Sequence, residues 1–327
     1  MRVVVIGATG HIGGHLVPRL VRGGHEVVAL SRGSRAPYRA DPAWDVVRRV
    51  TVDRDAADAD GTFGDLVADL APDAVVDLMC FTPASARLLV DALRGRCGHL
   101  LHCGTVWVHG HLMEVPVTES APRHPFGEYG IGKAAVERLL LAETARGGLA
   151  CTVLHAGHIS GAGWWVVNPA GNTDPGVWAD LATGRPVLLP DLGLTTLHHV
   201  HADDVASAFV AALDRRSAAA GESFHVVSPA ALTMRGFAEA AAGWFGREAV
   251  LEFAPWAQFA AAVGPETAAA SWDHVAHSPS VSVAKAAALL GWAPRFTSLQ
   301  ATFEAVRFQL DAGNLDIGTS TMAAAGL

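Results

Sequence analysis

The first 33 residues limit the possible folds of this chain more than any other segment. An apolar run at residues 2–6 leads directly into Gly7, Gly10 and Gly13. A helix-length segment follows, and a second apolar run ends at Ser31. Glycine lets the backbone turn tightly and approach a pyrophosphate, whose charge is favoured at the N-terminus of the next helix. The order strand, glycine turn, helix, strand therefore predicts a βαβ unit that binds a dinucleotide.

Short apolar segments alternate with helix-length segments through the first half of the chain. The strand-like segments are residues 46–52, 74–79, 99–103 and 150–154, and the intervening helices include residues 84–94 and 129–145. This alternation predicts an α/β protein, with a Rossmann doubly wound parallel sheet and helices on both of its faces.

The pattern becomes less regular after residue 155, which predicts a second, smaller lobe. We expect a dinucleotide-binding core at residues 1–155, to which residues 198–228 return. The mainly helical C-terminal substrate lobe is expected at residues 156–197, as loops with a short helix near 176–183, and at residues 229–312. Residues 313–327 are expected to form a loosely held tail. In such folds the ligand lies beyond the carboxyl ends of the strands, so the substrate is expected in the cleft between the lobes.

Composition excludes several classes of partner. The net charge is −8 and no cluster of Lys and Arg stands out, which argues against nucleic-acid binding. No apolar run is long enough to span a bilayer and no secretory signal is recognisable, so a cytoplasmic protein is expected. The four cysteines lack CxxC spacing, which favours reduced, buried thiols.

Three side chains predict a site for proton transfer. Tyr129 and Lys133 lie four residues apart at the start of a predicted helix, hence on one helix face. A tyrosine with an unperturbed pKa of about 10 transfers protons poorly at neutral pH, but a nearby ammonium favours the phenolate. Thr105, two residues past the strand that ends at Cys103, offers a hydroxyl that can hold the same carbonyl or alcohol oxygen.

With these motifs, the chain resembles the extended short-chain dehydrogenase/reductases of the NAD-dependent epimerase/dehydratase type over nearly its whole length. The landmarks are the glycine turn, Asp53-Arg54, Thr105 within segment 102–110, Glu119, Tyr129 with Lys133, Asp203-Asp204 after His201, and Gly291-Trp292 before Pro294. The resemblance implies a catalytic triad of Thr105, Tyr129 and Lys133, with Lys133 also holding the nicotinamide ribose. It implies that Asp53 and Arg54 contact adenine, and that Thr9, His11, Ile12 and Leu78 join the three glycines at the cofactor.

The end of the second strand indicates which dinucleotide is preferred. NAD-using members carry an acid there for the ribose 2′-hydroxyl, whereas this chain has Ser31 and Arg32, with Arg35 nearby. A carboxylate repels a 2′-phosphate, while a hydroxyl and a guanidinium attract it. We therefore predict NADP as the cofactor, with NAD as the alternative if both arginines are solvated surface charges.

The substrate side departs from the nucleotide-sugar members of the resembled family. Where those members place two arginines that grip the substrate's diphosphate, this chain has Leu197 and Trp272 by our alignment, and His158 replaces an Asn. The predicted substrate-binding residues are aromatic, amide or imidazole side chains: His109, His158, Trp164, Trp165 and Asn168. A pocket of this composition suits a small, weakly charged substrate.

The run His198-His199-Val200-His201 does not predict a metal site. Successive strand residues point to opposite faces, so the three imidazoles do not converge. His201 is expected to make structural hydrogen bonds.

These observations predict an NAD(P)-dependent oxidoreductase or epimerase that moves a hydride at a secondary alcohol or carbonyl of a small molecule. The first alternative is a nucleotide-sugar epimerase or dehydratase. The second alternative is a noncatalytic dinucleotide-sensing or RNA-binding relative, although such relatives often lose the Tyr/Lys pair that this chain keeps. No membrane partner is expected, and a helix-pair homodimer is a possible assembly, because it is common in the resembled family.

Overall fold

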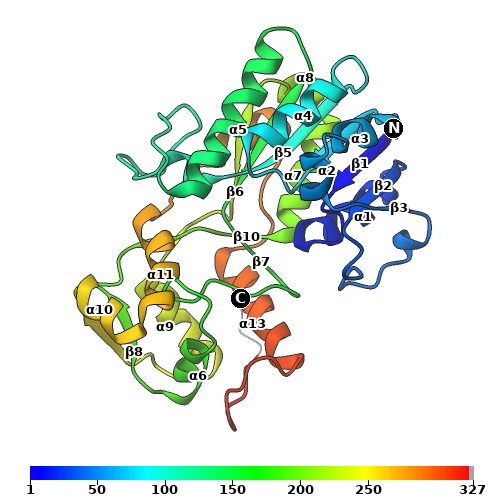
Figure 1. Ribbon diagram of the computed structural model, residues 1–327. Coiled ribbons are helices and arrows are strands. Elements are labelled where there is room, and N and C mark those ends of the chain that lie inside the picture. The colour runs from blue at the N-terminus through cyan, green and yellow to red at the C-terminus, as the bar shows by residue number, and fades with distance from the viewer. Residues whose placement is uncertain (324–327) are drawn as a thin grey trace.

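Seven parallel strands form the central sheet of the computed structural model, which describes residues 1–323 (Figure 1). Their order across the sheet is β11-β6-β5-β4-β1-β2-β3. The strands are β1 (Arg2–Ile6), β2 (Glu26–Ser31), β3 (Arg48–Thr51), β4 (Ala74–Asp77), β5 (His99–Thr105), β6 (Cys151–Ala156) and β11 (Ser223–Val226). Every strand pair in this sheet is parallel, so the predicted doubly wound parallel sheet is confirmed.

Helices cover both faces of the sheet. One face carries α1 (His11–Arg22), α7 (Ala202–Asp214) and α12 (Ala284–Leu290), and the other carries α3 (Phe63–Asp69), α4 (Pro83–Leu93) and α5 (Gly127–Ala145). Shorter elements complete the connections: η1 (Pro42–Asp45), α2 (Arg54–Ala59), η2 (Val106–His109) and α8 (Arg216–Ala219).

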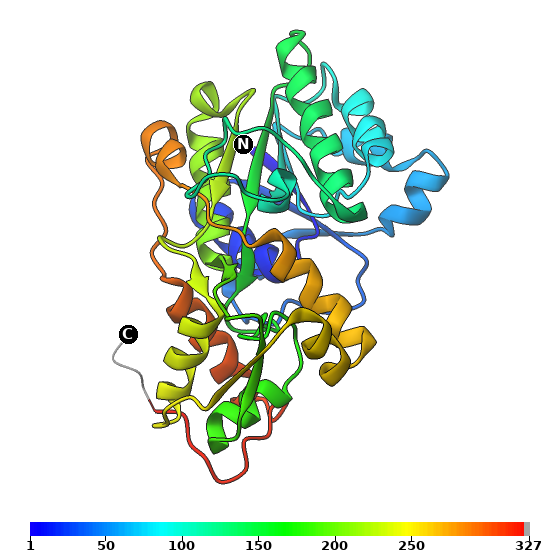
Figure 2. The same ribbon diagram turned by 90° about the vertical axis from the view of Figure 1, so that its left-hand side faces the viewer.

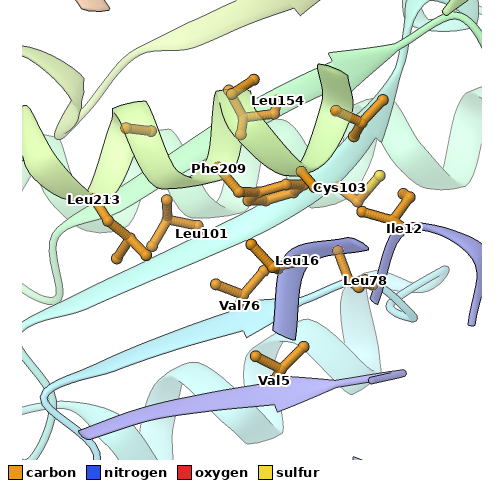
Figure 3. Close-up of a cluster of buried hydrophobic side chains, with 14 of the residues drawn as sticks. Val5, Ile12, Leu16, Val76, Leu78, Leu101, Cys103, Leu154, Phe209 and Leu213 are labelled. Atoms are coloured by element: carbon orange, nitrogen blue, oxygen red, sulfur yellow. The ribbon is translucent and has the colours of Figure 1, made fainter. Parts of the chain in front are cut away.

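The alternation of side chains along each strand builds two cores. Val3 and Val5 of β1 belong to the cluster beneath α1 and α7, whereas Val4 and Ile6 belong to the cluster beneath α3, α4 and α5. Figure 3 shows the first cluster, in which Phe209 of α7 lies over the strands. Both faces of each strand are buried, as expected for a parallel sheet covered by helices.

A smaller lobe lies beside the carboxyl ends of the strands (Figure 2). Its helices are α6 (Gly176–Thr183), α9 (Met234–Trp244), α10 (Trp256–Val263), α11 (Pro265–His277) and α13 (Ser298–Asp311). Its strands form three two-stranded pairs, β7 (His158–Ser160) with β10 (His199–His201), β9 (Thr196–Leu197) with β12 (Leu232–Thr233), and β8 (Val187–Pro190) with β13 (Leu251–Ala254).

Three details of this lobe differ from the expectation from sequence. Residues 156–197 contain strands β7, β8 and β9 in addition to the short helix. Helix α12 lies within the expected substrate lobe, yet its Ala286 and Leu290 pack into the core of the Rossmann lobe. Leu315 and Ile317 are buried in the core of the smaller lobe, so the part of the expected loose tail up to residue 323 is anchored by apolar contact. Residues 324–327 lie outside the described residues.

Candidate active site

The glycine turn after β1 has the shape that a pyrophosphate needs. Gly7 has a φ of +82°, and a Cβ on Gly13 would lie 2.2 Å from the carbonyl oxygen of Ala8. Gly10 precedes α1 without a side-chain cap, and the first turn of the helix holds no acidic residue. The N–H groups of this first turn have no partner within the helix, so they are available to an anion. The turn therefore fits the pyrophosphate of a dinucleotide.

The other residues predicted at the glycine turn are buried or half-buried, so they shape the turn. Thr9 is half-buried within the turn. Ile12 and Leu78 are buried, and both side chains belong to the core beneath α1 (Figure 3). A Cβ on Gly7 would lie 2.5 Å from Cγ of Met79 and 3.4 Å from Cβ of Leu78, so these two residues form the wall of the turn on the β4 side.

The predicted 2′-phosphate site lies at the end of β2, beside the glycine turn. The hydroxyl of Ser31 accepts a hydrogen bond from the N–H of Gly33 at 3.4 Å. Arg32 and Arg35 are exposed, and neither makes an ion pair or a side-chain hydrogen bond among the described residues. Both guanidinium groups are therefore available to a phosphate.

Arg54 and Asp53, for which the resemblance implies contacts with adenine, both have side-chain contacts within the protein. The guanidinium of Arg54 donates to the Asp77 carboxylate at 2.7 Å and to the Ser85 hydroxyl at 3.0 Å. The Arg54 side chain is only 11% exposed, so it links α2 to the end of β4 as a structural ion pair. Asp53 caps α2 by accepting hydrogen bonds from the N–H groups of Asp55 and Ala56. Aspartate is a preferred residue at the N-terminal cap of a helix, so this cap alone accounts for an aspartate at position 53.

Thr105 and Tyr129 meet at the carboxyl end of β5. Thr105 ends the strand, and its hydroxyl oxygen accepts from the N–H of Trp107 at 3.3 Å. Burial, and then the neighbouring Cys103, raise the pKa of Tyr129 to about 12, whereas a hydrogen bond from Thr105 acts in the opposite direction. Tyr129 keeps 44% of its surface exposed, so its ring remains open to a substrate. The pair can hold one substrate oxygen between two hydroxyl groups.

Lys133 lies one turn after Tyr129 on α5 and points into the protein. Its Nζ donates to the carbonyl oxygens of Cys80 at 2.8 Å and Cys103 at 2.7 Å. Burial lowers the pKa of Lys133. Nζ lies 5.8 Å from the ring centroid of Tyr129. Since an ammonium has three donors, one remains for a ribose hydroxyl or a water.

His158 lies among aromatic rings that border Tyr129. Its ring centroid is 4.9 Å from that of His274 and 6.2 Å from that of Trp107, and Trp107 meets Tyr129 edge-on at 5.7 Å. Burial lowers the pKa of His158 well below its usual value, and His274 acts in the same direction. Both ring nitrogens of His158 are buried without a partner among the described residues. A neutral imidazole with an unpaired donor and acceptor is costly unless a ligand or water takes them.

Sequence reasoning missed a stack of four rings next to this site. His277 of α11 lies between Trp107, with centroids 4.2 Å apart, and Phe126, with centroids 4.0 Å apart. Phe126 in turn stacks on His111 at 4.5 Å. The stack joins α11 of the smaller lobe to the start of the helix that carries Tyr129. The i, i+3 spacing of His274 and His277 is the one signal that sequence offered for it.

Two residues predicted to bind substrate have structural partners instead. His109 is 2% exposed, and its Nε2 lies 2.8 Å from Nε2 of His225. Asn168 is fully buried; its side chain accepts from the N–H groups of Ala170 and Asn172 and donates to Asp174. Because these contacts occupy the Asn168 amide, it organises the loop rather than the pocket.

The two tryptophans of the predicted pocket are both partly exposed. Trp164 stacks on His11, with ring centroids 5.3 Å apart, so it lies against the glycine turn. Trp165 is 38% exposed. At the two positions aligned with diphosphate-binding arginines, Leu197 is fully buried and Trp272 lies against Trp256, with centroids 4.9 Å apart.

Other predicted features can be compared directly with the structure. His201 caps α7 and its Nε2 contacts Glu304 at 3.0 Å, which confirms its structural hydrogen bonds. All four cysteines are free thiols, with Cys97 half-buried and the other three buried. Within residues 1–323, no three or more His, Cys, Asp or Glu side chains converge as metal ligands. The helices of the same residues include none with the length and apolar character to cross a membrane.

The sequence of this chain is similar to the sequences of a reductase and of UDP-glucose 4-epimerases. 2′-Dehydrokanamycin reductase of Streptomyces kanamyceticus is 33% identical over 229 residues, which are 70% of this chain and 62% of the reductase. UDP-glucose 4-epimerase of Azospirillum brasilense is 29% identical over 184 residues, which are 53% of this chain and 51% of that epimerase. This chain thus matches less than two thirds of the length of either relative.

A solved structure shows the same fold over nearly the whole chain. UDP-glucose 4-epimerase from Thermotoga maritima, solved with UDP-glucose, is similar with a TM-score of 0.72 and 18% identity, covering 95% of this chain and 99% of that one. The model of the NAD dependent epimerase/dehydratase family matches residues 3–226. With the glycine turn, the parallel sheet and this match in agreement, the chain belongs to the NAD-dependent epimerase/dehydratase family.

Proposed function

We propose that this protein is an NADP(H)-dependent oxidoreductase or epimerase that acts at a secondary alcohol or carbonyl of a small, weakly charged molecule. The observation that carries the proposal is the surroundings of Tyr129. Its ring borders Trp107, and behind Trp107 lie the neutral imidazoles of His158 and His277. This wall supplies stacking surfaces and single hydrogen bonds but no fixed positive charge.

Thr105, Tyr129 and Lys133 have separate roles at the substrate oxygen. Thr105 donates a hydrogen bond to that oxygen, and Tyr129 gives it a proton or removes one. Lys133 holds a positive charge beneath the ring of Tyr129 and keeps a free donor for the cofactor's ribose. A bound nicotinamide supplies the hydride acceptor or donor. In the protein alone the pKa of Tyr129 is about 12, so proton removal at neutral pH needs the further positive charge of the oxidised cofactor.

The two positions aligned with diphosphate-binding arginines favour a substrate without a diphosphate. A diphosphate that leaves water needs charge-assisted hydrogen bonds, and the two aligned positions hold buried Leu197 and the indole of Trp272. The relative named 2′-dehydrokanamycin reductase, whose name specifies no nucleotide sugar, supports this choice. Exposed Trp164 and Trp165 offer surfaces on which a sugar-like or other cyclic ring can stack.

A nucleotide-sugar epimerase or dehydratase is the second candidate. It is favoured by the relatives named UDP-glucose 4-epimerase and by the similar fold of such an enzyme. The same Thr105, Tyr129 and Lys133 serve both reactions. A noncatalytic relative is disfavoured because the chain keeps Thr105, Tyr129 and Lys133 together at the carboxyl end of β5, with Nζ of Lys133 5.8 Å from the ring centroid of Tyr129.

Calorimetric titration separates the two candidates. With saturating NADP⁺, UDP is expected to bind no better than millimolar. NADPH oxidation is then measured with a panel of uncharged and amine-bearing cyclic ketones, and with Tyr129→Phe as the control that removes the phenol alone. Micromolar binding of UDP, with turnover of a UDP-sugar, would refute the proposed substrate class and support the second candidate.

A further inference from the structure

The imidazole of His11 connects three segments that are distant in sequence. Its Nε2 lies 3.2 Å from the carbonyl oxygen of Ser160, and its Nδ1 lies 2.5 Å from the hydroxyl of Tyr38. Burial lowers the pKa of His11 to about 3, so the ring is neutral at pH 7 and carries a single hydrogen. A carbonyl oxygen only accepts, so that hydrogen lies on Nε2 and Nδ1 accepts from the phenol.

Tyr38 is fitted closely between the two lobes. A Cβ on Gly163 would lie 2.2 Å from Cε2 of the Tyr38 ring, and a Cβ on Gly14 would lie 3.7 Å from Cε1. The edge of the ring also meets Phe308 of α13, with centroids 6.5 Å apart. Because Gly163 has no side chain, the ring can approach the backbone of the substrate segment closely.

These contacts join the two ligand sites. Tyr38 belongs to the loop that follows β2, which also carries Arg32 and Arg35 of the predicted 2′-phosphate site. His11 begins α1, at the predicted pyrophosphate site. On the other side of His11 lie Ser160 and the stacked ring of Trp164, which belong to the predicted substrate pocket.

We infer that Tyr38 and His11 form a bridge through which binding of a dinucleotide positions the substrate segment at residues 159–165. The inference rests on the proposed dinucleotide-binding function. A cofactor held at the start of α1 and at Ser31 restrains both ends of the bridge. Tyr38 and His11 then restrain Ser160, Gly163 and Trp164. Coupling between two ligands is reciprocal, so the segment that receives substrate also contributes to cofactor affinity.

Hydrogen–deuterium exchange tests the bridge without any substrate. In the wild-type protein, saturating NADP⁺ is expected to slow exchange at residues 7–14 and 31–36, and also at residues 159–165. In Tyr38→Phe the ring remains but the hydrogen bond to His11 is lost. We expect NADP⁺ affinity to fall about twofold to twelvefold and protection of residues 159–165 to be largely lost, whereas residues 7–14 remain protected.

Two further variants make the result specific. The chain has two tyrosines, so Tyr129→Phe is a matched control that removes the other phenol and leaves the bridge intact. It is expected to show the wild-type pattern of protection. Gly163→Ala disrupts the bridge from the opposite lobe, because a Cβ there would lie 2.2 Å from Cε2 of Tyr38. The φ of +94° at Gly163 adds backbone strain in the same segment, so this variant is expected to lose at least as much protection as Tyr38→Phe.

The outcomes distinguish this inference from the proposed function. Binding of NADP⁺ without protection of residues 159–165 in the wild type overturns the bridge and leaves the oxidoreductase proposal standing. Full protection of that segment in both Tyr38→Phe and Gly163→Ala also overturns it. If neither NADP⁺ nor NAD⁺ binds, both the inference and the proposed function are wrong.

Discussion

Mild acid should unfold this protein, because many of its histidines are buried in neutral form. Five of them are at most 6% exposed and have a pKa lowered to about 3 or 4: His11 and His199 to about 3, and His99, His109 and His198 to about 4. Burial is the main cause in each case. In the unfolded chain the same side chains have a pKa of about 6.5.

The sign and size of the effect follow from proton binding. Below pH 6.5 these histidines bind protons in the unfolded chain but stay neutral in the folded protein. The free energy of unfolding therefore falls as the pH falls. Between pH 7 and pH 5.5 each such histidine costs about 1.2 kcal/mol of stability, and the five together cost about 6 kcal/mol. Since folded proteins are stable by about 5–15 kcal/mol, this is a large fraction of the total.

Urea unfolding followed by tryptophan fluorescence, at pH 7 and pH 5.5 and constant ionic strength, measures this loss. His99→Gln is the matched variant, because glutamine can keep the donation to the Thr152 hydroxyl at the position of Nε2, which lies 2.8 Å away. Its pH dependence should be smaller than that of the wild type by about 1.2 kcal/mol. Equal unfolding midpoints at the two pH values would show that the folded protein accepts these protons, and would refute the reasoning.

Three further predictions concern the site. Tyr129→Phe should lower turnover by about 10²–10⁴ while NADP⁺ affinity stays nearly constant, and Thr105→Ala should cause a smaller loss of the same kind; wild-type rates in steady-state assays of the phenylalanine variant would contradict the catalytic assignment. Arg32→Ala should narrow the preference for NADP⁺ over NAD⁺ by about 1–3 kcal/mol in calorimetric titrations, and a wild-type preference for NAD⁺ would make Arg32 a surface residue. Lys133→Met should remove activity and also leave two buried carbonyl groups unpaired, at about 1–3 kcal/mol each, so its melting temperature should fall by about 3–9 °C. An unchanged melting temperature would show that the two hydrogen bonds of Lys133 add no net stability.

Local patterns were enough to predict the Rossmann lobe. The glycine turn and the alternation of apolar segments with helices act over short stretches of chain, so they specify the strands and their parallel arrangement. The helix of Tyr129 and Lys133 and the strand end at Thr105 were predicted for the same reason. Their proximity at the carboxyl edge of the sheet follows from that arrangement.

Contacts between distant segments could not be predicted from these patterns. His109 pairs with His225, 116 residues away, and no spacing in the sequence indicates such a pair. Tyr38 reaches His11 only because a loop without regular structure folds back over α1. Asn168 is a different case, since asparagine in a loop often bonds to nearby backbone groups, and that local rule outweighs the prediction of a substrate contact.

The stack of Trp107, His277, Phe126 and His111 suggests where substrate range can change during evolution. Each stacked contact contributes about 0.5–1.5 kcal/mol beyond the area it buries, so the stack holds α11 firmly beside the proton-transfer residues. Under the proposed function, substitutions on the exposed positions of this helix change the surroundings of Tyr129 while the strand end with Thr105 stays in place. Mutant libraries that seek new substrates for this scaffold therefore belong on α11, with His277 kept constant as its anchor.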